Sequence, residues 1–311
     1  MLNVTNSVIF SRGEYMIKSL KSMRIVRIVY LFSAVIISVP VYSKTLSSGF
    51  HSNVEYGSAS GEKLLLDVNV PEGQGKFPIA IYVHGGGWTG GDKANPDDAP
   101  ILNMLTTAKY VWFSLNYRLA PLHRWPASQD DVQTAIRWVK KNAAHYKGDS
   151  SRIALIGYSA GGQLATYAAM VVDESISVQA VVGLAPLTDF VQELPKRGNI
   201  LGRAQRGLLN RPKELTAESL GILKALSPIN YVRPGLAPFL LVHGDADQSV
   251  PYQQSLAMQA RLKDNGVHCE LLTLPDAPHR LTEWTRFLPN YEEQIVSWMN
   301  QVLKYPKDTK S

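Results

Sequence analysis

The chain has 311 residues, of which 45% are hydrophobic and 19% are charged, so it is long enough to bury a substantial core and is not wholly disordered. Its single cysteine excludes an intrachain disulfide and any metal site built from cysteines. The 32 basic residues outnumber the 26 acidic ones, and the formal net charge is +6.

The first 43 residues have the pattern of a secretory signal peptide. Four basic residues between positions 18 and 27 precede an apolar run at 28–39, and Val41-Tyr42-Ser43 offers a cleavage site. The natural start is then Met16 or Met23. The apolar run is shorter than the ~20 residues that a transmembrane helix needs, and an uncleaved membrane anchor is the alternative.

Removal of this segment also removes most of the basic excess. It carries five of the 32 basic residues and one of the 26 acidic ones, which leaves 27 against 25. This near balance argues against a nucleic-acid partner. No cysteine lies near the predicted cleavage site, so a lipid anchor is not expected. We therefore expect a mature domain at 44–311 that is secreted or periplasmic and has no stable membrane insertion.

Short apolar segments alternate with helical segments along the mature chain. Apolar runs rich in β-branched and aromatic residues predict strands, at 64–70, 78–83, 111–115, 153–156, 178–184, 239–242 and 269–274. Helices are expected after Pro126, where Val132, Ile136, Val139 and Ala143 form one apolar stripe, and at 162–171, 254–262 and 291–303. This alternation is typical of an α/β fold, with a mostly parallel sheet and helices on both faces.

One long segment, at 186–236, interrupts the alternation before the strand at 239–242. It contains helical fragments and eight basic residues against four acidic ones. We expect it to form a small helical cap over the active site. Its positive charge is consistent with attraction of an anionic polysaccharide or with an ordinary solvated helical surface, and we favour the second interpretation.

A nucleophile motif follows the strand at 153–156. Gly157-Tyr158-Ser159-Ala160-Gly161 has the form G-x-S-x-G between a strand and a helix. In this context a sharp turn exposes the serine, and glycine neighbours are needed because a Cβ there would clash. Ser159 is therefore the predicted nucleophile.

A glycine-rich segment follows the strand at 78–83. In His84-Gly85-Gly86-Gly87-Trp88, glycines let backbone N–H groups approach an oxyanion closely. We predict that Gly86 and Gly87 donate to the oxyanion together with the amide of Ala160. His84 is expected to be structural, and Trp88 and Tyr158 are candidates for contact with the substrate.

A serine nucleophile needs a histidine base and a carboxylate that orients it. His279, in the loop after the strand at 269–274, is the predicted base, whereas His243 is expected to be a turn residue. Three aspartates compete for the third role: Asp247, Asp245 and Asp276. We favour Asp247, because Asp245 could equally tighten the turn. The order Ser, Asp, His is that of the α/β-hydrolase triad.

Taken together, these residues resemble the α/β-hydrolase superfamily, and more narrowly the BD-FAE branch that includes acetylxylan and feruloyl esterases. The resemblance runs from about Leu64 to Trp298 and rests on His84–Trp88, Asn116–Pro121, Pro126 with Asp130 and Asp131, Gly157–Gly162, Ser227-Pro228, His243-Gly244, Asp247 and Val250-Pro251. In that family the carboxylate is the fifth residue of His-Gly-x-x-Asp, here Asp247.

Two positions depart from related groups. The hormone-sensitive lipase group shares the His-Gly-Gly-Gly signature but usually has Asp before the nucleophile, where this chain has Tyr158. Similar esterases often have Gly before the histidine, where this chain has Pro278.

The resemblance implies a secreted serine carboxylesterase that removes short acyl groups, plausibly acetyl groups on carbohydrates, without a metal or an organic cofactor. A serine amidase or peptidase of the same fold is one alternative, although such peptidases usually carry a large additional domain. A non-catalytic binding protein is another, although inert relatives typically lose the nucleophile or the base.

Overall fold

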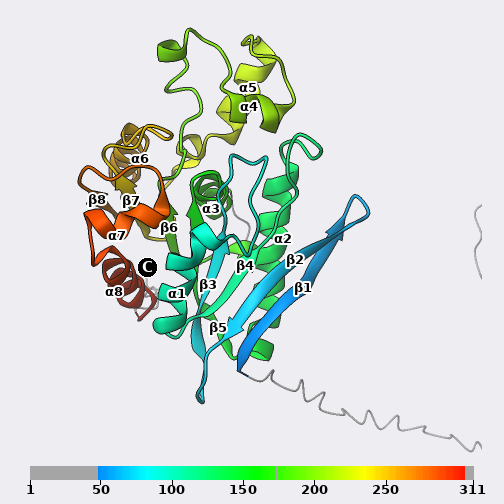
Figure 1. Cartoon of the computed structure of the whole chain (residues 1–311), viewed down its shortest axis with the longest axis vertical. Coiled ribbons are helices and arrows are strands. Elements are labelled where there is room, and N and C mark those ends of the chain that lie inside the picture. Colours follow the sequence, from blue (N-terminus) through cyan, green and yellow to red (C-terminus); the bar gives the residue numbers. More distant parts are fainter. Residues whose placement is uncertain (1–47, 172–173, 305–311) are drawn as a thin grey trace, which may run out of the picture. The chain divides into compact units, whose positions relative to one another are not determined.

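The computed structural model describes residues 48–171 and 174–304 (Figure 1). The predicted signal peptide at 1–43 lies outside these residues and stays a prediction. No helix within the described ranges is long and apolar enough to cross a membrane.

The described residues form one eight-stranded sheet with the order β1-β2-β4-β3-β5-β6-β7-β8. Strands β1 and β2, and β2 and β4, pair antiparallel, whereas every other neighbouring pair is parallel. The strands are β1 (Gly49–Ala59), β2 (Glu62–Val70), β3 (Phe77–Val83), β4 (Val111–Leu115), β5 (Gly148–Tyr158), β6 (Ala180–Leu184), β7 (Phe239–Gly244) and β8 (Cys269–Leu274). The expected α/β fold with a mostly parallel sheet is confirmed.

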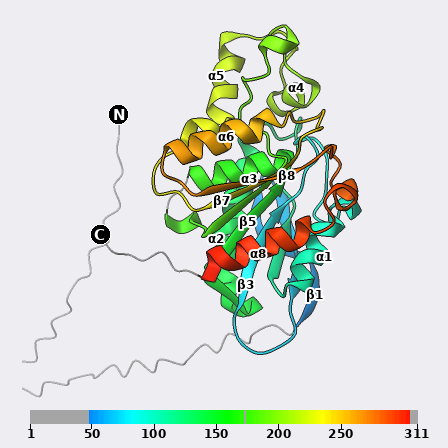
Figure 2. The same cartoon turned by 90° about the vertical axis from the view of Figure 1, so that its left-hand side faces the viewer.

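Helices cover both faces of the sheet (Figure 2). Buried side chains of α2, α3 and α6 belong to one hydrophobic cluster, and those of α1 and α8 belong to a second. These helices are α1 (Ala99–Thr107), α2 (Ala127–Asn142), α3 (Ala160–Met170), α6 (Gln253–Asp264) and α8 (Tyr291–Lys304), and a short α7 (Trp284–Phe287) precedes α8.

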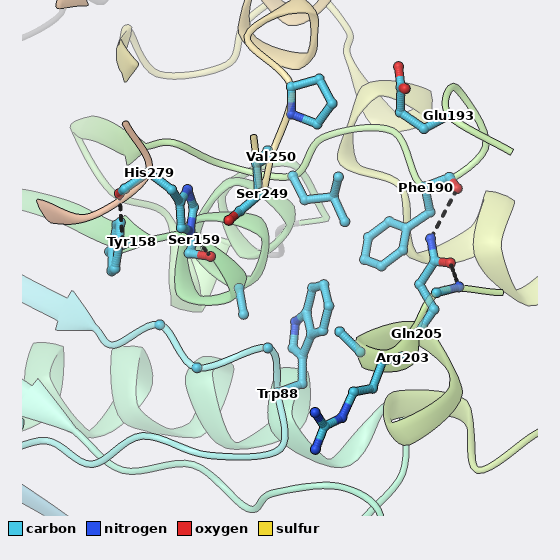
Figure 3. A pocket seen from close by; sticks show the side chains of 18 of the residues that line it. Trp88, Tyr158, Ser159, Phe190, Glu193, Arg203, Gln205, Ser249, Val250 and His279 are labelled. Carbon is cyan, nitrogen blue, oxygen red and sulfur yellow. Dashed lines mark hydrogen bonds between the residues drawn. The ribbon is translucent and has the colours of Figure 1, made fainter. Parts of the chain in front are cut away.

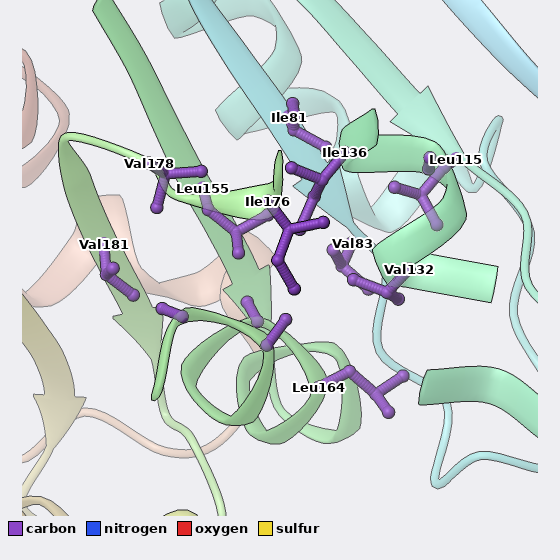
Figure 4. Close-up of a cluster of buried hydrophobic side chains, with 14 of the residues drawn as sticks. Ile81, Val83, Leu115, Val132, Ile136, Leu155, Leu164, Ile176, Val178 and Val181 are labelled. Carbon is purple, nitrogen blue, oxygen red and sulfur yellow. The ribbon is translucent and has the colours of Figure 1, made fainter. Parts of the chain in front are cut away.

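The central strands are apolar on both faces because each face is covered by helices. Along β3, Ile81 and Val83 join the cluster on the α2 and α3 side, whereas Tyr82 joins the cluster on the α1 and α8 side. Figure 4 shows Ile81 beside Ile136 and Val83 beside Val132, both of α2. This packing explains why the central strands read as continuous apolar runs.

Strand β1 and helix α1 were not expected from the sequence. Strand β1 lies at the edge of the sheet and most of its side chains are exposed or half-buried, so it has no apolar run to reveal it. Helix α1 buries three apolar side chains, Ile101, Met104 and Leu105, within nine residues. Strand β5 also begins five residues earlier than the apolar run at 153–156 indicates.

The segment at 186–236 lies between β6 and β7 and contains two helices, α4 (Arg203–Leu209) and α5 (Ala217–Leu226), with 3-10 turns at Pro195–Arg197 and Pro228–Tyr231. Both helices lie beyond the ends of the parallel strands, in the upper part of Figure 1.

An ion pair joins two residues of the sequence motif at 116–131, Arg118 and Asp131. Arg118 donates through Nε and Nη2 to the carboxylate of Asp131, at 2.8–3.1 Å, and the Arg118 backbone N–H donates to the same carboxylate at 2.8 Å. The Asp131 side chain is 2% exposed and the Arg118 side chain 11%. The pair fixes the chain after β4 to the first turns of α2.

We predict that Asp131→Asn lowers the free energy of unfolding by about 3 kcal/mol, because it leaves the Arg118 charge without its buried partner. Asp130→Asn is the matched control, since Asp130 is an exposed neighbour in the same helix, and it should change stability by less than about 0.5 kcal/mol. Urea unfolding followed by tryptophan fluorescence measures both variants. Equal stability of the two would contradict this role of the pair.

Candidate active site

Ser159 lies on a sharp turn between β5 and α3. Its backbone has φ 54° and ψ −115°, a conformation that is costly for a residue with a side chain. A Cβ on Gly157 would lie 2.1 Å from the carbonyl oxygen of Gly161, and one on Gly161 would lie 2.1 Å from that of Val83. Both glycines of the G-x-S-x-G motif are therefore required by close backbone approach.

The structure brings His279 between Ser159 and Asp247. His279 Nε2 lies 2.9 Å from Ser159 Oγ, and His279 Nδ1 lies 2.6 Å from Asp247 Oδ2. Because an ionised carboxylate only accepts hydrogen bonds, Nδ1 carries the proton and Nε2 is left to accept the proton of Ser159. This arrangement can activate a serine hydroxyl.

The carboxylate of Asp247 is buried and fully engaged. Its Oδ1 accepts the backbone N–H groups of Ser249 at 2.7 Å and Val250 at 2.9 Å. Burial alone would raise the pKa of Asp247, but hydrogen bonds from His243 and His279 outweigh it and hold this pKa well below its usual value. Asp247 therefore stays ionised beside His279.

The two competing aspartates lie elsewhere in the same loops. Asp245 Oδ1 accepts the backbone N–H of Asp276 at 2.7 Å, and this contact ties the loop after β7 to the loop after β8. The geometry thus assigns Asp245 to a turn and leaves Asp247 as the carboxylate at His279.

His243 differs from its expected place in a turn. It is the fifth residue of β7 and is fully buried. Its Nε2–H donates to the carbonyl of Val250 at 2.9 Å and lies 3.3 Å from Asp247 Oδ2, while its Nδ1 accepts the hydroxyl of Ser255 at 2.7 Å. The spacing of His243 and Asp247 in His-Gly-x-x-Asp was the available signal for this contact.

The candidate oxyanion donors lie around Ser159. Gly86 has φ 115° and would place a Cβ 2.1 Å from the carbonyl oxygen of Gly90, so only glycine fits there. Ala160 is the first residue of α3, and its N–H has no partner within the helix. Gly86, Gly87 and Ala160 all line the same cavity as Ser159.

His84 lies behind this glycine-rich loop. It is buried, its Nδ1–H donates to the carbonyl of Gly85 at 2.7 Å, and its ring stacks on Tyr117 with centroids 4.4 Å apart. Desolvation by burial lowers the pKa of His84, so its ring is neutral. This is the structural environment expected for His84.

Trp88 and Tyr158 line the cavity, but their polar atoms are used within the protein. Trp88 Nε1 donates to Gln163 at 2.9 Å, a buried partner that the sequence did not indicate. The hydroxyl of Tyr158 donates to the backbone carbonyl of His279 at 2.8 Å, and the two rings stack at 5.3 Å. Either residue can therefore contact a ligand only through its ring.

The cavity beside Ser159 has a volume of about 590 Å³. Figure 3 shows Ser159, His279 and Tyr158 on one side of it and Phe190 with Gln205 on the other. Its walls come from the glycine-rich loop, from the loops after β7 and β8, and from the segment at 186–236. Among the residues at 48–171 and 174–304, no group of three or more His, Cys, Asp or Glu side chains could hold a metal ion.

Comparison with known proteins agrees with this fold. The BD-FAE family model matches residues 66–262. The chain is 33% identical to esterase LipC of Mycobacterium tuberculosis over 240 residues, which cover 72% of this chain and 58% of LipC. It is 31% identical to esterase LipQ of the same organism, with 73% of this chain and 56% of LipQ covered. The chain thus spans less than two thirds of either relative.

Solved structures of similar fold include two enzymes with names that mention carbohydrate or acetyl esters. A carbohydrate esterase from gut microbiota superposes with a TM-score of 0.72 at 24% identity, covering 86% of this chain and 99% of that one. An acetyl ester-xyloside bifunctional hydrolase from Caldicellulosiruptor lactoaceticus superposes with a TM-score of 0.69 at 22% identity, covering 82% and 97%. At these identities the similarity concerns the fold.

The two neighbouring aspartates provide a test of the site. Asp247→Asn should lower kcat for an activated ester by about 10,000-fold, because the amide oxygen would accept the N–H groups of Ser249 and Val250 and the amide NH2 would then donate to His279 Nδ1, which favours the wrong tautomer. Asp245→Asn removes the same charge two residues away and should cost less than about tenfold, since the amide oxygen of Asn can still accept the backbone N–H of Asp276. Steady-state kinetics measure kcat for both variants. A larger loss of kcat in Asp245→Asn than in Asp247→Asn would contradict the assignment of Asp247 as the carboxylate that orients His279.

Proposed function

The chain belongs to the BD-FAE family of α/β-hydrolases, and from this membership and the site geometry we propose that it is a serine carboxylesterase acting on short-acyl esters. The observation that carries the proposal is the hydrogen-bonded chain from Ser159 through His279 to Asp247, with contacts of 2.9 and 2.6 Å. The three groups have the order and the polarity that a serine nucleophile requires.

In the first half of the reaction, Ser159 Oγ attacks the ester carbonyl while His279 Nε2 accepts its proton. Asp247 stabilises the resulting imidazolium, and the amides of Gly86, Gly87 and Ala160 donate to the oxyanion. His279 then returns the proton to the leaving alcohol as the C–O bond breaks, which leaves an acyl group on Ser159.

In the second half, water attacks the acyl group and His279 accepts a proton from that water. Collapse of the second tetrahedral intermediate releases the acid and restores the serine hydroxyl. Besides the ester itself, water is the only reactant in these steps that comes from outside the protein.

Two features support esters with a small acyl group, and acetyl esters of carbohydrates are the first to test. Trp88 and Phe190 both line the cavity beside Ser159, with ring centroids 5.2 Å apart, and a long acyl chain would have to extend past this aromatic wall. Structural neighbours of this chain include a carbohydrate esterase and an acetyl ester-xyloside bifunctional hydrolase. Trp88 and Tyr158 would meet the substrate with their rings.

We also propose that the segment at 186–236 acts as a cap. Phe190, Ala204 and Gln205 from this segment line the cavity. The segment is tied to the catalytic domain by Gln163 of α3, which donates to the carbonyl of Leu226 at 3.0 Å. A substrate bound at Ser159 would therefore contact both the sheet loops and the cap.

The proposal predicts that Ser159→Ala abolishes hydrolysis of p-nitrophenyl esters, with a loss of at least about 10,000-fold in kcat/KM, because the nucleophile is removed. In the parent enzyme, activity across an acetyl-to-decanoyl series should peak at two to four carbons. Initial rates followed at the p-nitrophenolate absorbance measure both effects.

The variant Ser58→Ala provides the matched control. Ser58 is an exposed serine of β1, so this variant should retain full activity. Circular dichroism of Ser159→Ala should match the parent, since loss of one Oγ removes little packing. Hydrolysis that survives in Ser159→Ala would contradict the assignment of the nucleophile. Ser159-dependent cleavage of p-nitroanilides without cleavage of esters would indicate an amidase instead.

We further propose that residues 1–43 act as a signal peptide and that the mature protein is secreted or periplasmic. The support is the basic stretch, the apolar run and the Val41-Tyr42-Ser43 site in the sequence. Expression in a Gram-negative host should give a mature N-terminus at Lys44, as read by mass spectrometry of the exported protein. Protein with an intact N-terminus in the cytoplasmic fraction would contradict this.

A further inference from the structure

The first turns of the cap carry an unusual concentration of arginine. Residues 197–206 contain Arg197, Arg203 and Arg206 and no acidic residue, and all three arginines are exposed. Two other basic residues of the cap are in ion pairs, Lys196 with Glu193 and Arg211 with Glu218. Among the described residues, none of the three arginines has an ion-pair partner.

Two of these arginines, Arg197 and Arg203, line the cavity that contains Ser159. Helix α4 lies against the glycine-rich loop, because a Cβ on Gly87 would be 3.5 Å from the Cβ of Ala204. Arg203 therefore directly precedes Ala204, which packs against Gly87, a proposed oxyanion donor. Figure 3 shows Arg203 on the same side of the cavity as Trp88.

Arg197 reaches the same place from the preceding 3-10 turn. A Cβ on Gly202 would lie 2.8 Å from Arg197 Nη1, so the guanidinium of Arg197 rests against Gly202, the residue before Arg203. The lack of a side chain at Gly202 allows this approach. Arg197 and Arg203 thus both line the cavity from the cap.

Acidic residues also line the cavity, but those on the cap are already engaged. Asp189 Oδ1 accepts the backbone N–H groups of Val191 at 2.8 Å and Gln192 at 3.2 Å, and Glu193 pairs with Lys196 at 3.2 Å. Asp97 belongs to the 3-10 turn before α1, which contacts the turn at Leu281–Glu283, and Arg280, next to that turn, also lines the cavity. Counted with Lys196, three basic residues of the cap stand against Asp189 and Glu193, which leaves a net charge of +1 on the cap side of the cavity.

From this arrangement we infer that Arg197 and Arg203 form a subsite for a carboxylate on the alcohol part of the ester, such as an acidic sugar. The inference rests on the proposed esterase function. Both residues line the cavity and are exposed, whereas Ser159 is half-buried, so we place them at the solvent side of the cavity, where part of a bound ester would extend out of it. In a short-acyl ester that part is the alcohol, and guanidinium groups match a carboxylate with paired N–H donors.

The test compares neutral and acidic esters that differ only in the carboxylate. One pair is 4-acetoxybenzoate and its methyl ester, and a second is acetylated glucuronic acid and its methyl ester. Arg197→Gln/Arg203→Gln should lower kcat/KM for each acidic ester by about tenfold, since two partly exposed charge contacts are lost, and change that for the neutral esters by less than about twofold. Taking each ratio against the parent enzyme cancels the intrinsic reactivity of the ester.

Arg206→Gln is the matched control, because Arg206 lies on α4 and is exposed but does not line the cavity. This variant should leave kcat/KM unchanged for both esters of each pair. Added 0.5 M NaCl should also lower kcat/KM of the parent enzyme for the acidic esters, and it should leave kcat/KM for the neutral esters unchanged.

Equal losses on neutral and acidic esters in the double variant, or an equal effect of Arg206→Gln, would overturn the subsite. Neither result would affect the esterase proposal, which stands on Ser159-dependent hydrolysis of the neutral esters. Conversely, absence of Ser159-dependent hydrolysis of any ester would remove the esterase proposal and the subsite together.

Discussion

The close approach of the β5–α3 turn to the end of β3 is the constraint on which the rest of the site depends. Val83 of β3 pairs in register with Gly157 of β5, so the two parallel strands end side by side. Gly161 then packs directly against the Val83 carbonyl, with no room for a side chain. The same contact brings the glycine-rich loop after β3 to the strained serine after β5, so nucleophile and oxyanion donors share one scaffold.

The base and the acid depend on a second pair of neighbouring strands. β7 and β8 are parallel, and the loops that follow them carry Asp247 and His279. Two interactions fix these loops: His243 of β7 contacts the buried carboxylate, and Tyr158 of β5 holds the His279 backbone. The residue before the nucleophile therefore restrains the base, and a small shift in β5 would alter both ends of the Ser159–His279 contact.

The sequence was sufficient for the features that depend on local pattern. Apolar strands buried on both faces, glycines forced by backbone contact and the order of Ser159, Asp247 and His279 each leave a signal within a few residues. Strand β1 left none, because an exposed edge strand needs no apolar run. The partners of Trp88 and Tyr158 were also beyond reach, because Gln163 and the His279 carbonyl lie 75 and 121 residues away in the chain. Only the fold decides such contacts.

Substrate choice depends on the part of the chain that the fold constrains least. The parallel strands fix where Ser159 and its oxyanion donors lie, but the opposite wall of the cavity comes from a connection between β6 and β7. Because that connection need only pack on α3 and the glycine-rich loop, its outward charges are free to vary without cost to the catalytic geometry. Arg197 and Arg203, which line the cavity from this connection, are charges of this kind, so they can change substrate preference without altering the reaction itself.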